Sequence, residues 1–174
     1  MKKLFTISMF IFFILINKSV LANSDSSKAM RCSSLLMILT ALSNVNEGLG
    51  NTLTYQKMSA DDLANIYQIK KTGKGYTNGE IQEINSNHMR KIGKDYPNNY
   101  NKIEKEIHNC MGWVASVQQF VASKQNSIND NNFMDILLSG PRPGNYKLEG
   151  FENFKPYIKV AFDEWIKLGM ITPR

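Results

Sequence analysis

The stretch from Ala29 to Val45 constrains the fold of this chain more than any other segment. At about 100° per residue of a helix, its apolar residues fall into two stripes on roughly opposite sides. The larger stripe comprises Cys32, Leu35, Leu39 and Leu42, flanked by Leu36 and Ile38, and the smaller stripe comprises Met30, Met37 and Ala41. A surface helix needs one apolar stripe, so two stripes predict a helix that is covered from both sides. We therefore expect this helix to be the centre of an all-α bundle.

Further helical patterns follow along the chain and predict a single bundle of five or six helices. We expect the other helices at residues 59–71, 77–93, 98–123, 133–138 and 154–168. Ser59 with Asp62, and Thr77 with Glu80, have the spacing of a capping box at a helix start. The glycine-containing stretch 47–51 predicts a break before the second helix. No alternating apolar and polar run is long enough to predict a strand.

Residues 1–22 have the pattern of a secretory signal peptide. Lys2 and Lys3 precede an apolar run at residues 4–16, and a small residue, Ala22, ends the segment. The run of 13 residues is shorter than the roughly 20 that a membrane-spanning helix needs, and no stop-transfer pattern follows. We expect cleavage after Ala22, which leaves one domain, residues 23–174, exported to the periplasm or secreted, with no stable membrane anchor.

Loss of the leader also lowers the charge of the protein. Lys2, Lys3 and Lys18 leave with it and no acidic residue does, so the net charge falls from +6 to +3. A charge this small, in an exported protein, argues against a nucleic acid as partner.

The only two cysteines are Cys32 and Cys110, 78 positions apart. In an oxidising compartment such a pair predicts a structural disulfide. Cys110 lies in the apolar stripe of the helix expected at 98–123, as Cys32 lies in the stripe of the central helix, so the bond agrees with the packing. The chain has two histidines, so it offers few ligands for a metal ion. Methionines at helical spacing are typical of core filling rather than of a copper site. We expect no cofactor and no metal.

His88 is the ionisable residue that most invites a catalytic role, because it shares a helix face with Ile81, Ile84 and Ile92. A general base needs a nucleophile and an orienting partner, and the sequence contains no motif that supplies them. We therefore favour a hydrogen-bonded structural histidine. His108 lies four residues after Glu104, a spacing that predicts a surface pair.

Two basic clusters and two aromatic residues are the candidates for an interaction surface. The clusters lie at the ends of the second and third helices, where cations also complement the helix dipole, and we favour that explanation. The aromatic residues lie about 100° from the main stripe of the helix at 98–123. We expect the final helix to cover them as core residues, whereas exposed aromatic side chains would be binding anchors. The candidates are Lys70, Lys71, Lys74, Arg90, Lys91, Lys94, Trp113 and Phe120.

The absence of a catalytic motif and the expected disulfide-linked bundle favour a non-enzymatic exported protein. We predict that it acts by binding another protein, as an inhibitor, an immunity factor or an accessory subunit does. A small exported hydrolase with His88 in its site is one alternative, and a carrier of a small ligand or metal is another. A deep pocket with His88 and a carboxylate would favour the hydrolase, and a solid core with an exposed aromatic patch would favour protein binding.

Overall fold

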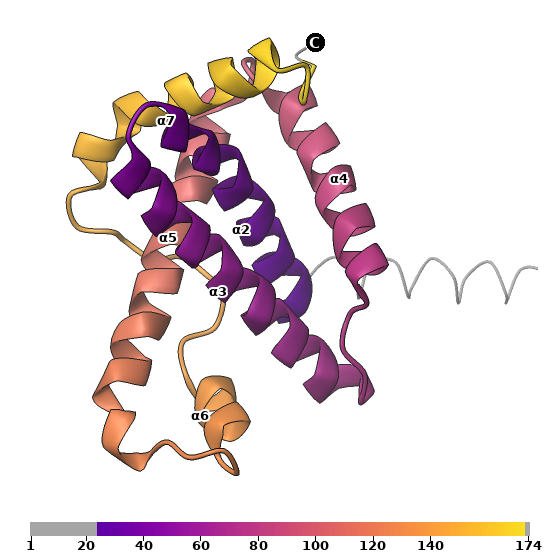
Figure 1. Cartoon of the computed structure of the whole chain (residues 1–174), viewed down its shortest axis with the longest axis vertical. Coiled ribbons are helices and arrows are strands. Elements are labelled where there is room, and N and C mark those ends of the chain that lie inside the picture. The colour runs from indigo at the N-terminus through magenta and orange to yellow at the C-terminus, as the bar shows by residue number, and fades with distance from the viewer. Residues whose placement is uncertain (1–23, 173–174) are drawn as a thin grey trace, which may run out of the picture.

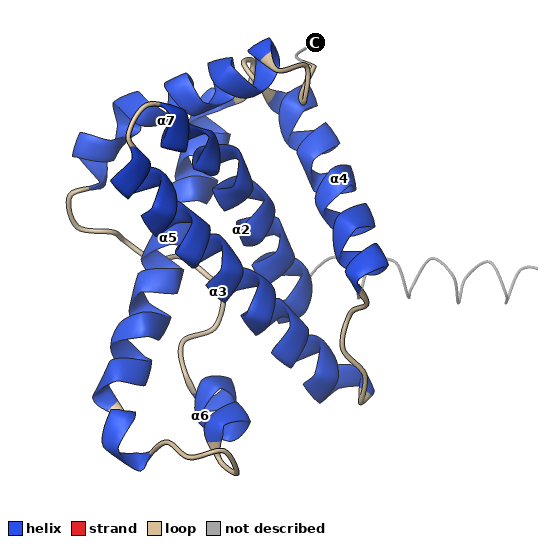
Figure 2. Cartoon of the chain, in the orientation of Figure 1, coloured by secondary structure: helices blue, strands red, loops and turns tan. Residues whose placement is uncertain are grey.

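The computed structural model of the chain describes residues 24–172, so the expected signal peptide lies outside the described residues. The predicted all-α class is confirmed, because the structure is 77% helical and its described part contains six α-helices and no strand (Figure 2). The α-helices are α2 (Asp25–Leu39), α3 (Glu47–Thr72), α4 (Asn78–Asp95), α5 (Tyr100–Ser123), α6 (Phe133–Ser139) and α7 (Phe151–Lys167), and the short 3₁₀ helices are η1 (Thr40–Asn44) and η2 (Gln125–Ser127).

Helix α2 is the central helix, as predicted. It contacts α3, α4, α5 and α7, and Figure 1 shows it enclosed by these neighbours. Met30 from the smaller stripe and Leu36 and Leu39 from the larger side are fully buried. The helix is displaced from the expected range: it begins at Asp25, where Ser24 caps it, and residues 40–44 tighten into the 3₁₀ helix η1.

The predicted disulfide between Cys32 and Cys110 is present and joins α2 to α5. The two Cα atoms are 5.3 Å apart, within the range that an undistorted bridge requires. Both cysteines are nearly buried, so the bond lies within the packed seam of the two helices. A disulfide is consistent with an oxidising, exported environment.

The predicted start of the second helix at Ser59 is wrong. Helix α3 begins at Glu47, because the Asn46 side chain accepts a hydrogen bond from the Leu49 backbone N–H and caps it there. Gly50, which suggested a break, is instead a close-packing site, because a Cβ atom on it would collide with the Cα and Cβ atoms of Ser43. The Ser59 hydroxyl donates to a backbone carbonyl within the helix and caps nothing.

The final helix and the loop before it pack on α5 through His108, for which we expected a surface position. The imidazole stacks on the Phe151 ring with centroids 4.1 Å apart, and its Nε2 accepts a hydrogen bond of 2.9 Å from the Leu148 backbone N–H. The expected surface pair with Glu104 is therefore wrong, since Glu104 pairs with Lys155 of α7. His108 positions the start of α7.

Candidate functional site

Helix α4 packs against α2 and α5, and its last turn also lies against Ile171, which follows α7. Its start has the predicted capping box, in which Thr77 and Glu80 bond each other's backbone N–H groups. Figure 1 shows it set apart from α3. One groove consequently lies on each flank of α4. These two grooves are the candidate sites.

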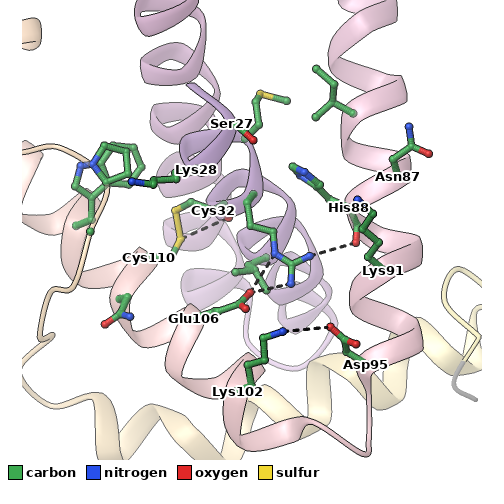
Figure 3. A pocket seen from close by; sticks show the side chains of 18 of the residues that line it. Ser27, Lys28, Cys32, Asn87, His88, Lys91, Asp95, Lys102, Glu106 and Cys110 are labelled. Carbon is green, nitrogen blue, oxygen red and sulfur yellow. Dashed lines mark hydrogen bonds and ion pairs between the residues drawn. A yellow bond between two sulfur atoms is a disulfide. The ribbon is translucent and has the colours of Figure 1, made fainter. Parts of the chain in front are cut away.

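The first groove, which we call the arginine groove, lies over α2 between α4 and α5 and has a volume of about 970 Å³. Arg31 lies between α5 and α4, because its guanidinium donates to Glu106 of α5 and to the His88 backbone carbonyl of α4. Figure 3 shows Glu106 and His88 on opposite sides of the groove. The disulfide and the buried Trp113 lie among its lining residues. Its charged lining residues are Lys28, Arg31, Lys91, Asp95, Lys102 and Glu106.

Cations outnumber carboxylates in the arginine groove by two. Arg31 donates from Nε and Nη2 to one oxygen of Glu106, at 3.1 and 2.8 Å. Lys102 and Asp95 are 4.0 Å apart, which is a weak pair at the solvent surface. Lys28 and Lys91 form no ion pair with any described residue. The charged side chains that line the groove therefore sum to a net charge of +2.

His88 lies in the wall of the arginine groove, but its bonds are structural. Its Nδ1 is 3.3 Å from the Ser34 hydroxyl, which is completely buried. That hydroxyl also lies 2.9 Å from the Met30 carbonyl oxygen and 2.7 Å from Oδ1 of Asn85, and these two acceptors share its single proton. Burial, followed by the nearby Arg31 charge, lowers the pKa of His88, so the neutral ring is favoured. This polar cluster joins α4 to α2. Because Ser34 is inaccessible, the cluster presents no serine nucleophile to the groove.

The second groove, which we call the methionine groove, lies on the other flank of α4 and has a volume of about 850 Å³. Its apolar lining comes from α2, α4, α7 and the residues after α7, and consists of Met37, Ile81, Met89, Trp165, Met170 and Ile171. Met170 is 61% exposed, so part of this apolar surface is open to solvent. Trp165 is held in place because its Nε1–H donates to the Ile38 carbonyl at 2.7 Å.

Basic side chains border the methionine groove. Arg90 and Lys94 lie one turn apart on α4, and no described carboxylate pairs with either of them. Lys57 of α3 also lines the groove, but Asp61 holds it at 2.6 Å. No acidic residue lines the groove, so it combines an apolar surface with two unpaired positive charges.

The structure separates the basic residues that the sequence suggested as an interaction surface. Helix α4 directs Arg90 and Lys94 to the methionine groove, whereas Lys91 lines the arginine groove. The other cluster lies at the exposed end of α3 and lines neither groove; its members are Lys70, Lys71 and Lys74.

The two aromatic candidates on α5 are packed within the fold. Trp113 is 1% exposed and donates from Nε1 to the Pro141 carbonyl at 2.9 Å, and the half-buried Phe120 lies against Gly140. The loop after α6 makes these contacts, where we expected the final helix. Trp113 is thus a core residue, as favoured from the sequence.

Sequence reasoning did not single out most of the residues that line the grooves. Met37 and Trp165 were assigned to apolar stripes. An apolar stripe indicates that a helix face is buried, but it does not indicate which part of that face a neighbouring helix leaves uncovered. Arg31 of the central helix faces the arginine groove, together with Ser27 and Lys28 of the same helix. The position of this cation among the apolar residues of the helix was a signal that could have identified it.

Neither groove offers a metal site. Within residues 24–172 no three His, Cys, Asp or Glu side chains are grouped closely enough to hold a metal ion. None of the helices formed by those residues is both long and apolar enough to span a bilayer.

Comparison of the chain with protein-family models, with curated proteins and with solved structures found no match.

Proposed function

We propose that this protein is exported and acts by binding another protein, which it holds in the methionine groove. The observation that carries the proposal is the open apolar lining of that groove, with Trp165 fixed in it and two unpaired cations at its edge. Partly exposed apolar surface costs free energy in water, and a fixed aromatic side chain is a frequent source of interface affinity. An inhibitor, an immunity factor or an accessory subunit would use such a surface.

A hydrolase that uses His88 is less well supported. His88 does share the arginine groove with carboxylates, but Glu106 is engaged by Arg31, and Asp95 lies opposite Lys102. The Nδ1 side of the imidazole faces the buried Ser34. The groove therefore lacks the aligned nucleophile, base and orienting group that hydrolysis requires.

One observation favours a second candidate function, the carriage of a small anionic ligand. Lys28 and Lys91 lie in the arginine groove without a carboxylate partner in the described part of the chain. A dicarboxylate such as succinate would then raise the melting temperature of the protein above that in sodium chloride of equal ionic strength. The increase should disappear in the variant Lys28→Gln with Lys91→Gln. An equal response of the variant would contradict this candidate.

Site-specific cross-linking tests the proposed protein binding. A photoreactive residue at Gln82 or Ser86, both in the methionine groove, should link to the same protein in the cells that make this chain. The control is the same residue at Gln118, which is exposed on α5 and lines neither groove. Identical products from Gln82 and Gln118, or no protein product from either groove position, would contradict the proposal.

A further inference from the structure

We infer that the partner enters the methionine groove as an amphipathic α-helix that carries acidic residues beside its apolar face. This inference rests on the proposed function and names the chemistry of the partner segment. It follows from three properties of the groove: what it can bond, how long it is, and which charges border it.

The hydrogen-bonding capacity of the groove favours a helix over an extended segment. A bound strand needs a free sheet edge for its backbone, and the described part of this chain contains no strand. Six of the 13 lining residues are apolar, and the polar ones at its wall are side chains such as Gln82 and Ser86. An extended partner backbone placed there would find scattered side chains, and no row of backbone groups, to replace its hydrogen bonds to water. A helix satisfies its own backbone and presents only side chains.

The length of the groove fits a short helix. Its lining residues on α4 run from Ile81 to Lys94, which at 1.5 Å per residue corresponds to about 20 Å. A partner helix of about 13 residues covers that distance and places apolar side chains at positions i, i+4, i+7 and i+11 along it.

The side chains of the groove suit such an apolar face. The half-buried Met37 and the exposed Met170 are unbranched and adapt to side chains of different shapes. Trp165 is the fixed element among them, because the Ile38 carbonyl holds its indole. The groove therefore accepts leucine-like side chains without requiring one particular shape.

The charges at the border select acidic flanks. Arg90 and Lys94 lie on the same face of α4 and have no carboxylate partner among the described residues, and no acidic residue lines the groove. Asp or Glu residues beside the apolar face of the partner would pair with them, whereas Lys or Arg there would be repelled. Charge complementarity thus distinguishes the partner from an arbitrary apolar helix.

Two synthetic peptides of 14 residues test the inference on the mature protein. Both have leucines at helical spacing; one has glutamates on both flanks of the leucine face, and the other has lysines there. Trp165 reports binding through its fluorescence, since the only other tryptophan, Trp113, is 1% exposed. The glutamate peptide should bind, and at low salt its affinity should exceed that of the lysine peptide by about tenfold or more.

A charge-reversal variant makes the test specific to the groove. Arg90→Glu with Lys94→Glu should weaken the glutamate peptide by about tenfold or more and should now bind the lysine peptide. The matched control is Lys70→Glu with Lys71→Glu, which makes the same charge change near the end of α3, outside the groove, and should keep the original preference. Far-UV circular dichroism checks that both variants are folded.

Three results would overturn the inference. The first is equal binding of the two peptides, or equal effects of the two variants. The second is the absence of binding by the glutamate peptide at millimolar concentrations while Gln82 still cross-links to a protein, in which case the proposed function stands with a partner segment of another kind. The third is a homodimer that dissociates in the Arg90→Glu, Lys94→Glu variant, which would make a second copy of this chain the occupant.

Discussion

Replacement of Trp113 by alanine separates a core residue from a binding anchor. The side chain is 1% exposed, and its Nε1–H donates to the Pro141 carbonyl at 2.9 Å. Deletion of a buried Trp side chain typically costs about 3 to 5 kcal/mol of unfolding free energy. Because the Tyr67 hydroxyl also donates to Pro141, at 3.4 Å, the carbonyl keeps one partner, so we expect no large additional loss from it.

Replacement of Trp113 by phenylalanine isolates the hydrogen bond from most of the packing. The phenyl ring fills much of the indole site but cannot donate to Pro141, so we expect a loss of about 1 to 2 kcal/mol. Each kcal/mol lowers the melting temperature of a chain of this size by roughly 2 to 4 °C. The alanine variant should then melt roughly 6 to 20 °C below the wild type.

Urea unfolding followed by far-UV circular dichroism measures both variants without depending on the tryptophan that is removed. Cross-linking from Gln82 serves as the second readout, because Trp113 does not line the methionine groove. A loss below about 1 kcal/mol for the alanine variant, with an unchanged m-value, would refute the assignment of Trp113 to the core. A stable alanine variant that no longer cross-links would make Trp113 a binding anchor instead.

Three further predictions concern the disulfide, the histidine of α4 and the start of α3. Protein purified without reductant should contain no free thiol by mass spectrometry after alkylation, and two alkylated cysteines would contradict this. Replacement of both residues, Cys32→Ala with Cys110→Ala, should lower the unfolding free energy in urea by about 4 kcal/mol, since the bond closes a loop of 78 residues. The pKa of His88 is lowered in the folded state, so the unfolded chain takes up the proton first as pH falls below 6.5. His88→Gln should therefore reduce the fall in melting temperature between pH 7 and pH 5. An unchanged fall would contradict the lowered pKa of His88 in the folded state. Gly50→Ala should destabilise the protein in thermal melts, because its Cβ would collide with the Ser43 backbone, and a neutral effect would show that η1 can move away.

The sequence was sufficient to predict the features that depend on apolar periodicity, on capping residues or on the cysteine pair. The two stripes around Leu36 predicted a central helix, and the expectation of export together with the stripe positions of Cys32 and Cys110 predicted the disulfide. The capping box at Thr77 located the start of α4 to within a residue. Each of these predictions used residues that lie close together in the sequence, or the two cysteines, which have no other cysteine to pair with.

Features that depend on contacts between distant elements were not predictable in this way. Glycines usually disfavour a helix, and only the approach of Ser43 to Gly50 explains why α3 contains one there. The position of His108 required the knowledge that Phe151 would stack on it. The methionine groove exists because α4 leaves part of α2 and α7 uncovered, and periodicity cannot show which part of an apolar stripe a neighbour fails to reach.

The polar seam between α2 and α4 explains why the two grooves differ in chemistry. Apolar side chains alone would hold α4 without fixing its rotation, because hydrophobic attraction has no direction. The hydrogen bond between Ser34 and Asn85 is buried and directional, and Arg31 approaches the His88 carbonyl from the other side. Successive residues of a helix point about 100° apart, so a fixed rotation sends Lys91 into one groove while Arg90 enters the other. An apolar replacement of Asn85 could therefore leave α4 attached to α2 and still disturb the charge pattern by which each groove would select its ligand.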